Sequence, residues 1–404
     1  MKQVRHESST FWPRIWASPL EGLGFVTILL FLTGAINVFS ASFVLGSQLF
    51  GDSLYFLKRH FAATVIGFIG IAIVIKQGYR WIFHYLPVWT LITLGLLIAV
   101  PFFGIEVNGA RRWLTVGRFI SFQPSELAKL TAVLLAVSYL GPRIDKKPIT
   151  LVSYPLLITT ALFGLVAVQP DMGTGMIVFA MCLIPYLLAG IPIREWLLLI
   201  VGGIVSTGLL INQYAYRTER IWAWINPEQY SQTSGYQPMQ SLLAVGSGGF
   251  KGTGLGMGSS KFYYLPEAHT DFAFAVWAQE TGFVGSLAVL FLLGSMTFYG
   301  MRIALQSADG RGRVLSIGVL FLIIGQAVGN IAMVLGLLPV TGVPMPFFSY
   351  GGSALIVNLW AMGLLFSVAI ESARRRRIID ENQSGGFPKQ PKLRLSQRLA
   401  RKRT

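Results

Sequence analysis

Long apolar runs constrain this sequence more than any other feature. Several separate stretches of about 17 to 25 residues carry almost no charge, which is the length that a helix needs to cross the hydrocarbon core of a bilayer. Only 12% of the 404 residues are charged, whereas an ordinary soluble domain has about 25%. The sequence therefore predicts an all-α integral membrane protein.

Ten apolar runs, between 14 and 28 residues long, are separated by polar segments or by segments rich in glycine and proline, so we predict about ten transmembrane helices. An even number places both ends of the chain on one side of the membrane. The predicted spans are residues 22–43, 61–75, 82–103, 127–140, 151–168, 173–188, 197–211, 272–299, 314–337 and 354–370.

Basic residues gather in the segments that this topology places on one face, and by the positive-inside rule that face is cytoplasmic. Residues 1–20 then form a cytoplasmic N-terminal segment, residues 21–372 the membrane domain, and residues 373–404 a basic cytoplasmic tail that we expect to be disordered. The tail follows the last span directly, so its charge fits anionic lipid rather than nucleic acid. The other basic residues on this face are Lys2, Arg5, Arg14, Lys76, Arg80, Arg143, Lys146, Lys147, Arg194, Arg302, Arg311 and Arg313.

Two kinds of site are disfavoured. The single cysteine, Cys182, and four scattered histidines give neither a disulfide framework nor a zinc pattern. A glycine-rich stretch at 246–256 has spacings like those of nucleotide-binding loops, but it lacks a strand-turn-helix context. Tight turns, or a backbone that approaches a lipid headgroup, explain these glycines better.

The longest segment without a predicted span covers residues 212–271, between predicted helices seven and eight on the extracytoplasmic face. A loop of this length is usually functional or disordered, and its many aromatic residues favour function at the headgroup level. Those aromatic residues are Trp222, Trp224, Tyr230, Tyr236, Phe262, Tyr263 and Tyr264.

Three arginines lie in one short loop on the extracytoplasmic face, although most basic residues lie on the cytoplasmic face. Arg111, Arg112 and Arg118 could bind an anionic headgroup, because guanidinium groups pair with phosphate through two hydrogen bonds. Alternatively, they are ordinary interfacial arginines that meet lipid phosphates beside Trp113. We favour a headgroup site.

A carboxylate and an amine follow at the start of the next span. Glu126 and Lys129 are three residues apart, so they share one face of a helix that Pro124 and Ser125 can begin. Ionisable residues at the membrane edge are functional candidates. The alternative is a structural pair that holds two helices together.

The end of the long loop carries three titratable residues, Glu267, His269 and Asp271, with Glu280 further into the following span. A carboxylate at a half-buried mouth beside cations suits a general base that acts on a sugar hydroxyl. Asp271 or Thr270 could instead be a simple helix N-cap.

Proline and glycine crowd residues 339–353, just before the last span. This composition cannot continue a helix, so we predict a re-entrant segment that is sheltered by protein or lines a wet cavity.

Taken in order, these stretches resemble the SEDS family of membrane glycosyltransferases that polymerise peptidoglycan. The resemblance implies a ten-helix fold in the bacterial cytoplasmic (inner) membrane, lipid II as substrate and undecaprenyl diphosphate as the leaving group. The stretches that carry it are residues 108–114, 123–129, 169–174, 235–241, 246–256, 265–272 and 338–353.

The resemblance also implies roles for individual residues. Asp271 matches the essential acid of the family and is expected to be the catalytic base on the extracytoplasmic face, while Glu126 would position Lys129. A divalent cation, Mg or Mn, would suit the diphosphate leaving group, although no ligand for it is identified. The residues expected to contact substrate are Arg111, Arg112, Glu126, Lys129, Glu267 and His269.

Ala268 in the motif 266–269 resembles the division member of the family, whereas residues 339–342 are more like the elongation or sporulation members. We favour the division member, with an elongation polymerase as the alternative. Either assignment implies a single-span class B penicillin-binding transpeptidase (FtsI-like) as partner, with other divisome membrane proteins for a division role. The alternatives are a lipid II flippase, which would need a polar route that reaches both faces, and a scaffold to which Asp271 is dispensable.

Overall fold

The computed structural model describes residues 18–383 except 108, 117–119, 145–148, 213–214 and 263. Arg118, most of the N-terminal segment and residues 384–404 lie outside this part of the chain. The tail does not begin as an irregular segment, because its residues 373–383 continue the last helix. Arginine and glutamate are good helix formers once the preceding span has nucleated the helix, and the division into domains stays a prediction.

Each of the ten predicted spans is helical over most of its length, although the fifth, eighth and ninth extend up to three residues beyond the helices. The third span is divided into α3 and α4, and the ninth is formed by α12, a π-helical turn η1 and α13 in succession. The helices are α1 (Pro19–Phe50), α2 (Tyr55–Gln77), α3 (Tyr79–His84), α4 (Leu86–Phe103), α5 (Pro124–Leu140), α6 (Tyr154–Val168), α7 (Met172–Leu188), α8 (Ile193–Asn212), α11 (Ala273–Leu305), α12 (Gly310–Leu320), η1 (Phe321–Gly325), α13 (Gln326–Val334) and α14 (Gly352–Gln383).

Six helical stretches in the described part of the chain are long and apolar enough to cross a membrane. They are α1, α2, α4, α11, the continuous stretch from α12 to α13, and α14, while α6 and α7 are shorter apolar helices. The predicted class, a helical membrane protein, is confirmed. The count of ten passes stays a prediction.

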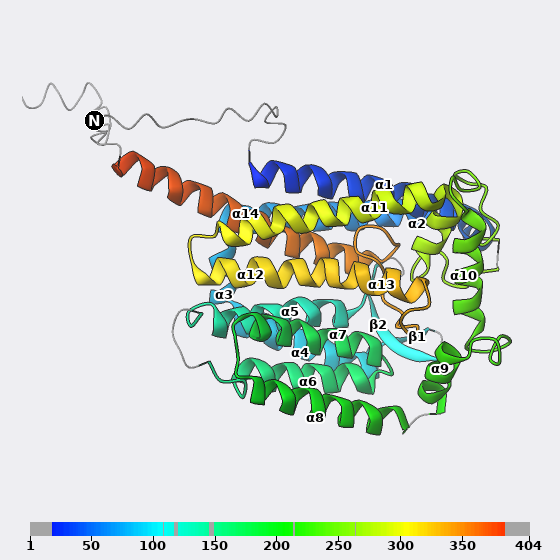
Figure 1. Ribbon diagram of the computed structural model, residues 1–404, viewed down its shortest axis with the longest axis horizontal. Helices are drawn as coiled ribbons and strands as arrows, with labels where there is room; N and C mark the ends of the chain where they lie inside the picture. The colour runs from blue at the N-terminus through cyan, green and yellow to red at the C-terminus, as the bar shows by residue number, and fades with distance from the viewer. Residues whose placement is uncertain are drawn as a thin grey trace, which may run out of the picture.

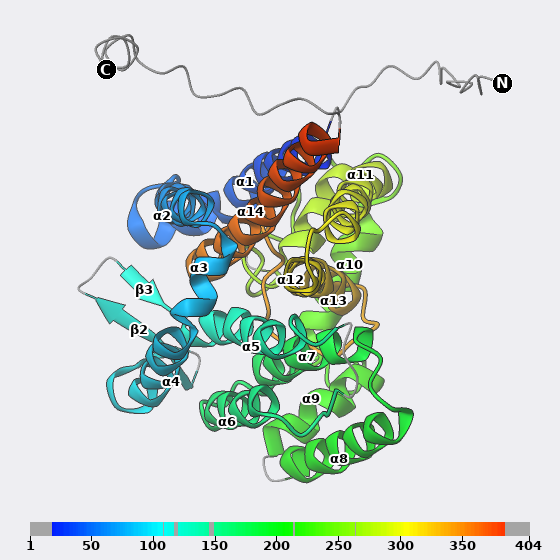
Figure 2. The same ribbon diagram turned by 90° about the vertical axis from the view of Figure 1, so that its left-hand side faces the viewer.

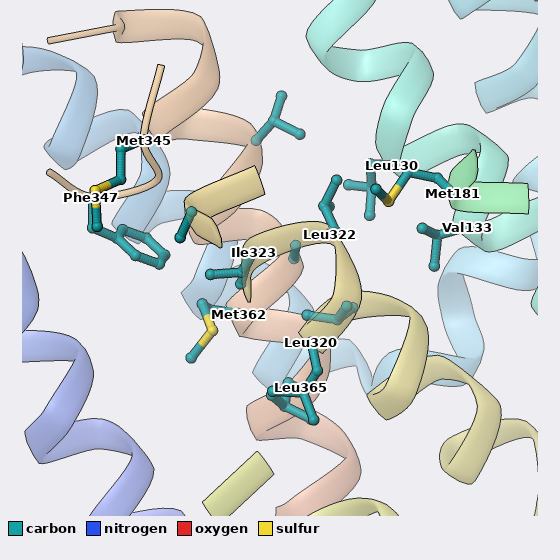
Figure 3. Close-up of a cluster of buried hydrophobic side chains, with 14 of the residues drawn as sticks. Leu130, Val133, Met181, Leu320, Leu322, Ile323, Met345, Phe347, Met362 and Leu365 are labelled. Atoms are coloured by element: carbon teal, nitrogen blue, oxygen red, sulfur yellow. The ribbon is translucent and has the colours of Figure 1, made fainter. Parts of the chain in front are cut away.

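The helices lie side by side in one bundle, with α14 packed on α2, α1 on α11 and α5 on α7 (Figures 1 and 2). Figure 3 shows the middle of the bundle, where side chains from five parts of the chain meet. They come from α5, α7, the stretch from α12 through η1, α14 and the segment between α13 and α14. Labelled members are Leu130, Val133, Met181, Leu320, Leu322, Ile323, Met345, Phe347, Met362 and Leu365.

The connections that the sequence analysis placed outside the membrane gather at one end of the bundle, which we call the sheet end (Figure 1). Both ends of the described chain lie at the opposite end, as expected for an even number of passes. The long loop is not irregular throughout, because it contains the helices α9 (Ala215–Ile225) and α10 (Tyr236–Gly248). A small antiparallel sheet, which the sequence analysis did not predict, consists of β1 (Ile105–Val107), β2 (Ala110–Val116) and β3 (Ile120–Phe122).

The glycine-rich stretch crosses α11 at a break in that helix. Gly282 has a φ of 67°, and a β-carbon on Gly252 would lie 2.2 Å from the carbonyl oxygen of Glu280. The loop backbone replaces helix hydrogen bonds, since Gly254 N donates to Glu280 O and Phe283 N donates to Gly249 O, both at 2.9 Å. These glycines therefore serve a close backbone crossing rather than nucleotide binding.

Candidate active site

Asp271 lies at the sheet end, between the long loop and α11. The N-cap position of α11 is Phe272, whose side chain makes no capping hydrogen bond, so the interpretation of Asp271 or Thr270 as a simple cap is wrong. The side chain is half-buried. Burial raises the pKa of Asp271 to about 7, and the nearby carboxylates of Glu267 and Asp171 act in the same direction. Arg220 and Arg112 oppose this rise in the pKa.

The re-entrant segment lies directly against the segment that carries Asp271. A β-carbon on Gly342 would be 3.5 Å from Asp271 Oδ2, and Tyr350 N donates to the carbonyl oxygen of His269 at 2.9 Å. The predicted shelter is present, because Met345, Phe347 and Phe348 are buried among the helices. Two motifs far apart in the sequence thus form one wall of the site.

Both segments have a strained residue. Glu267 has a φ of 54° and Phe347 a φ of 63°, values that residues with a side chain rarely adopt. The Thr270 hydroxyl donates to a carboxylate oxygen of Glu267 at 2.7 Å, which helps to hold this turn. Strain of this kind persists only where the surroundings fix it, and such places are often functional.

His269 is enclosed by aromatic rings. Its ring centroid is 4.7 Å from that of Phe56 and 5.6 Å from that of Tyr350. Burial lowers the pKa of His269, and the charge of Glu267 only partly opposes this. An imidazole that is enclosed by tilted aromatic rings and has a lowered pKa suits a packing role more than that of a cation for a phosphate.

Arg112 reaches the neighbourhood of Asp271 from strand β2. Its guanidinium group donates to the carbonyl oxygen of Pro170, and its Nη1 lies 4.0 Å from Asp171 Oδ1. Its Nε is buried and has no hydrogen-bond partner. Asp171 is fixed in turn at the N-cap of α7, where it accepts from Thr174 N at 3.3 Å. Arg112 therefore combines a fixed position with an unused donor.

Arg111 points elsewhere, because adjacent residues of a strand face opposite sides. Its Nε is 3.8 Å from a carboxylate oxygen of Glu106, and its Nη1 donates to Pro101 O at 3.3 Å. It lines a separate surface cavity with Glu106 and Gln169. The two arginines that the sequence analysis grouped together are thus divided, and Arg112 is the one whose charge acts on Asp271.

Glu126 and Lys129 form the predicted ion pair at 2.7 Å, but both side chains are almost fully buried, at 4% and 1% exposure. Lys129 Nζ also donates to Gln326 Oε1 at 2.6 Å, so it connects α5 to the start of α13. With its partners inside the bundle, this ammonium group fits the structural alternative better than direct contact with a diphosphate.

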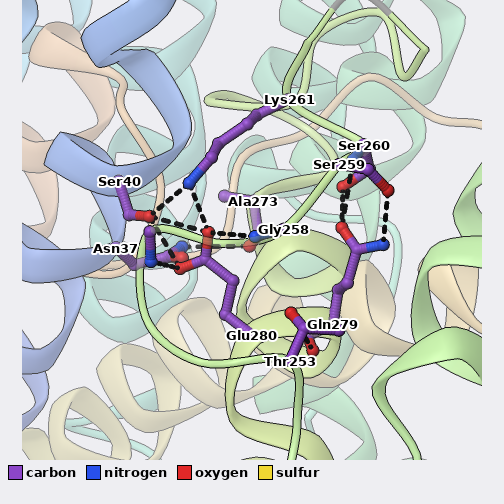
Figure 4. A network of polar contacts seen from close by, with 11 residues as sticks. Asn37, Ser40, Thr253, Gly258, Ser259, Ser260, Lys261, Ala273, Gln279 and Glu280 are labelled. Atoms are coloured by element: carbon purple, nitrogen blue, oxygen red, sulfur yellow. Dashed lines mark hydrogen bonds and ion pairs between the residues drawn. The ribbon is translucent and has the colours of Figure 1, made fainter.

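A second buried ion pair anchors the helix that follows Asp271 (Figure 4). Lys261 Nζ lies 2.6 Å from Glu280 Oε1, and Ser40 of α1 donates to the other oxygen of that carboxylate at 2.6 Å. From α1, Asn37 also donates to the carbonyl oxygen of Ala273 at 3.0 Å. The sequence analysis noted Glu280 but not Lys261, because no spacing rule relates a loop lysine to a helix nineteen residues away.

Two cavities border the segment that carries Asp271. One, of about 310 Å³, lies between α2, the sheet and the start of α14, and it includes Arg59, Trp113, Thr270 and Tyr350. The other, of about 240 Å³, contains Arg220 and is lined by α9, the start of α10, Pro266 and Val340. The sequence analysis did not single out Arg220. The position of α9, where Trp224 Nε1 donates to Gly336 O at 2.9 Å, brings Arg220 near enough to Asp271 to act on its pKa.

A metal site does not emerge from the described residues. No group of three or more histidine, cysteine, aspartate or glutamate side chains there could hold an ion. Asp271 and Asp171 interact electrostatically, but no third histidine, cysteine, aspartate or glutamate among the described residues completes a metal site with them. The prediction of a divalent cation stays untested.

Comparison with known proteins decides the family. The family model described as "Cell cycle protein", which covers FtsW, RodA and SpoVE, matches residues 22–374. The chain belongs to the SEDS family. This SEDS protein is 37% identical over 364 residues to stage V sporulation protein E of Bacillus subtilis, an alignment that covers 87% of the chain and 97% of the relative.

Proteins named FtsW are similarly related to this SEDS protein. It is 38% identical over 349 residues to a probable peptidoglycan glycosyltransferase FtsW of Trichlorobacter lovleyi, covering 83% of the chain and 89% of the relative. A solved chain from a peptidoglycan synthase complex that coordinates polymerization and crosslinking has the same fold, with a TM-score of 0.71 and 29% identity. That match covers 88% of this chain and 99% of the other. The predicted family is therefore confirmed.

Proposed function

We propose that this SEDS protein is a peptidoglycan glycosyltransferase that joins lipid II units into glycan strands and releases undecaprenyl diphosphate. The observation that carries the proposal is the position of Asp271, half-buried between two segments and near Arg112 and Arg220. The FtsW relatives named as probable peptidoglycan glycosyltransferases support the same reaction.

Asp271 acts as general base in this mechanism. It takes the proton of the 4-hydroxyl of the acceptor sugar while the hydroxyl oxygen forms a bond to the anomeric carbon of the donor. The bond between that carbon and the diphosphate oxygen breaks, and its electron pair leaves with undecaprenyl diphosphate. A carboxylate whose pKa is near 7 suits this step, because it is available as a base at neutral pH and still binds the proton well.

Arg112 and Arg220 lie where they can stabilise the charge that develops on the diphosphate, as guanidinium groups do in other phosphate sites. A divalent cation would add to this stabilisation when bound together with the substrate. In this proposal Arg111, Glu267 and His269 shape the surroundings of the reacting groups, and Lys129 acts from inside the bundle.

We assign the sheet end to the extracytoplasmic face of the bacterial inner membrane, with both termini in the cytoplasm. The distribution of basic residues supports this orientation. A class B penicillin-binding transpeptidase is the proposed partner, in line with the structural neighbour from a synthase complex. Several FtsW relatives favour a role in division with the other divisome membrane proteins, and the sporulation relative is the alternative.

A lipid II flippase is the second candidate, because discontinuous helices are common in transporters and α11 is broken at Gly282. The test is lipid II polymerisation by the purified chain with its transpeptidase, comparing wild type with Asp271→Asn after both are shown to fold. Glycan strands from wild type alone support the proposal. Equal product from both variants would remove Asp271 from the mechanism, and lipid II crossing in liposomes without polymer would favour the flippase.

A further inference from the structure

Asn330 makes an unusual pair of contacts next to Asp271. Its side chain is buried on α13, and its single amide nitrogen donates to two backbone carbonyl groups. The Nδ2 atom is 2.7 Å from the carbonyl oxygen of Asp271 and 2.9 Å from that of Val343. One carboxamide therefore joins the segment that carries the proposed base to the re-entrant segment.

This bridge supplies what the start of α11 lacks. Phe272 at the N-cap makes no side-chain capping hydrogen bond, so the turn at Asp271 depends on other contacts, such as the hydrogen bond from Phe272 N to Glu267 O at 3.2 Å and the one from Asn330 to Asp271 O. The re-entrant backbone passes close to the carboxylate at Gly342, the neighbour of Val343. A change in the distance between the two segments would therefore move the carboxylate relative to its surroundings.

The helix that carries Asn330 is itself anchored. One turn before Asn330, Gln326 accepts from Lys129 Nζ and donates to the carbonyl oxygen of Leu322, both at 2.6 Å. Gln326 follows the π-helical turn η1 directly, and such turns are often found at functional sites. The Glu126–Lys129 pair is thus connected to Asp271 through α13, without contact between Lys129 and the reacting groups.

We propose that Asn330 is a positioning residue for the reaction, whose carboxamide fixes the backbone of Asp271 against the re-entrant segment. The inference rests on the function proposed above. A displacement of the base by about 1 Å can reduce a rate about a hundredfold, so the loss of this bridge affects the chemical step more than substrate binding.

The experiment measures kcat, KM and the pH profile of lipid II polymerisation for Asn330→Ala and Asn330→Leu, in complex with the transpeptidase. Leucine has the same branched arrangement of four side-chain heavy atoms as asparagine but no hydrogen-bond donor, so it decides the question alone if the alanine variant does not fold. We expect kcat to fall about 10- to 100-fold in both variants, with KM within about threefold of wild type. The midpoint of the pH profile should also move, because Asp271 would sit differently among its charged neighbours.

Tyr186→Phe provides a matched structural control. It removes a buried side-chain hydrogen bond to Ser153, at 2.5 Å, in another part of the bundle. A kcat and pH profile equal to wild type in a folded Asn330→Leu protein would overturn the inference. A fall in kcat that Tyr186→Phe reproduces at the same melting temperature, with no change in the pH midpoint, would also overturn it. Since wild type and Asp271→Asn are tested separately, either result leaves the proposed reaction standing.

Discussion

The carboxylate of Asp271 faces the backbone of Gly342, where a β-carbon would lie 3.5 Å from Oδ2. Gly342 has a φ of 70°, which disfavours every residue with a side chain. At 3.5 Å the added carbon would make only an ordinary contact, so the positive φ, and not the space beside Asp271, is what favours glycine at this position.

Gly342→Ala should reduce polymerisation about tenfold or more, because the strained alanine shifts the segment away from Asp271. Gly51→Ala is the matched control, since Gly51 has a φ of 66° with no other atom near the added carbon. Rates of glycan formation by folded variants provide the measurement. An equal loss in both variants would mean that backbone strain alone, and not the contact with Asp271, matters.

The rate of polymerisation should depend on pH through Asp271. The base acts as a carboxylate, and its pKa is raised to about 7, so the rate should fall about tenfold per pH unit well below 7 and level off above it. Arg112→Gln removes a cation that lowers this pKa, so its midpoint should lie at higher pH. A pH profile that stays flat from 5 to 8 in the wild type would contradict the assignment.

The Glu126–Lys129 pair should behave as a structural unit. Lys129→Met leaves a buried carboxylate without its ion-pair partner, so we expect the free energy of unfolding to drop by about 3–5 kcal/mol and activity to fall with it. The double variant Glu126→Gln, Lys129→Met should recover much of both. Thermal unfolding and polymerisation are measured on all three. Recovery of stability without recovery of activity would instead favour contact between Lys129 and the substrate.

Lys261→Met should loosen the glycine-rich loop. The carboxylate of Glu280 would keep its hydrogen bonds to Ser40 and Gly256 N but lose the ion pair, so amide hydrogen exchange in residues 249–261 should speed up. Lys58→Met removes an exposed ion pair with Asp52 and should change little. Equal exchange in wild type and Lys261→Met would show that the backbone crossing at Gly282 holds the loop unaided.

Local signals in the sequence were sufficient for several features. Helix geometry and proline chemistry predict three of them: the start of α5 at Pro124, the Glu126–Lys129 ion pair and the buried segment before α14. The structure contains all three. The sheet from β1 to β3 was missed because its strands are short and lie in a loop whose glycines and arginines give no clear alternation.

The sequence by itself determined that this protein lies in a lipid bilayer and that its proposed base is a carboxylate. Apolar length dictates helices in lipid, and Asp271 stands out as a carboxylate at the border of a span. Only the tertiary structure decided which charges act on it. Packing separates Arg111 from Arg112, encloses Lys129 and brings Arg220 and Asn330 to Asp271 from distant segments. These relationships depend on contacts between residues remote in the chain, which no local pattern encodes.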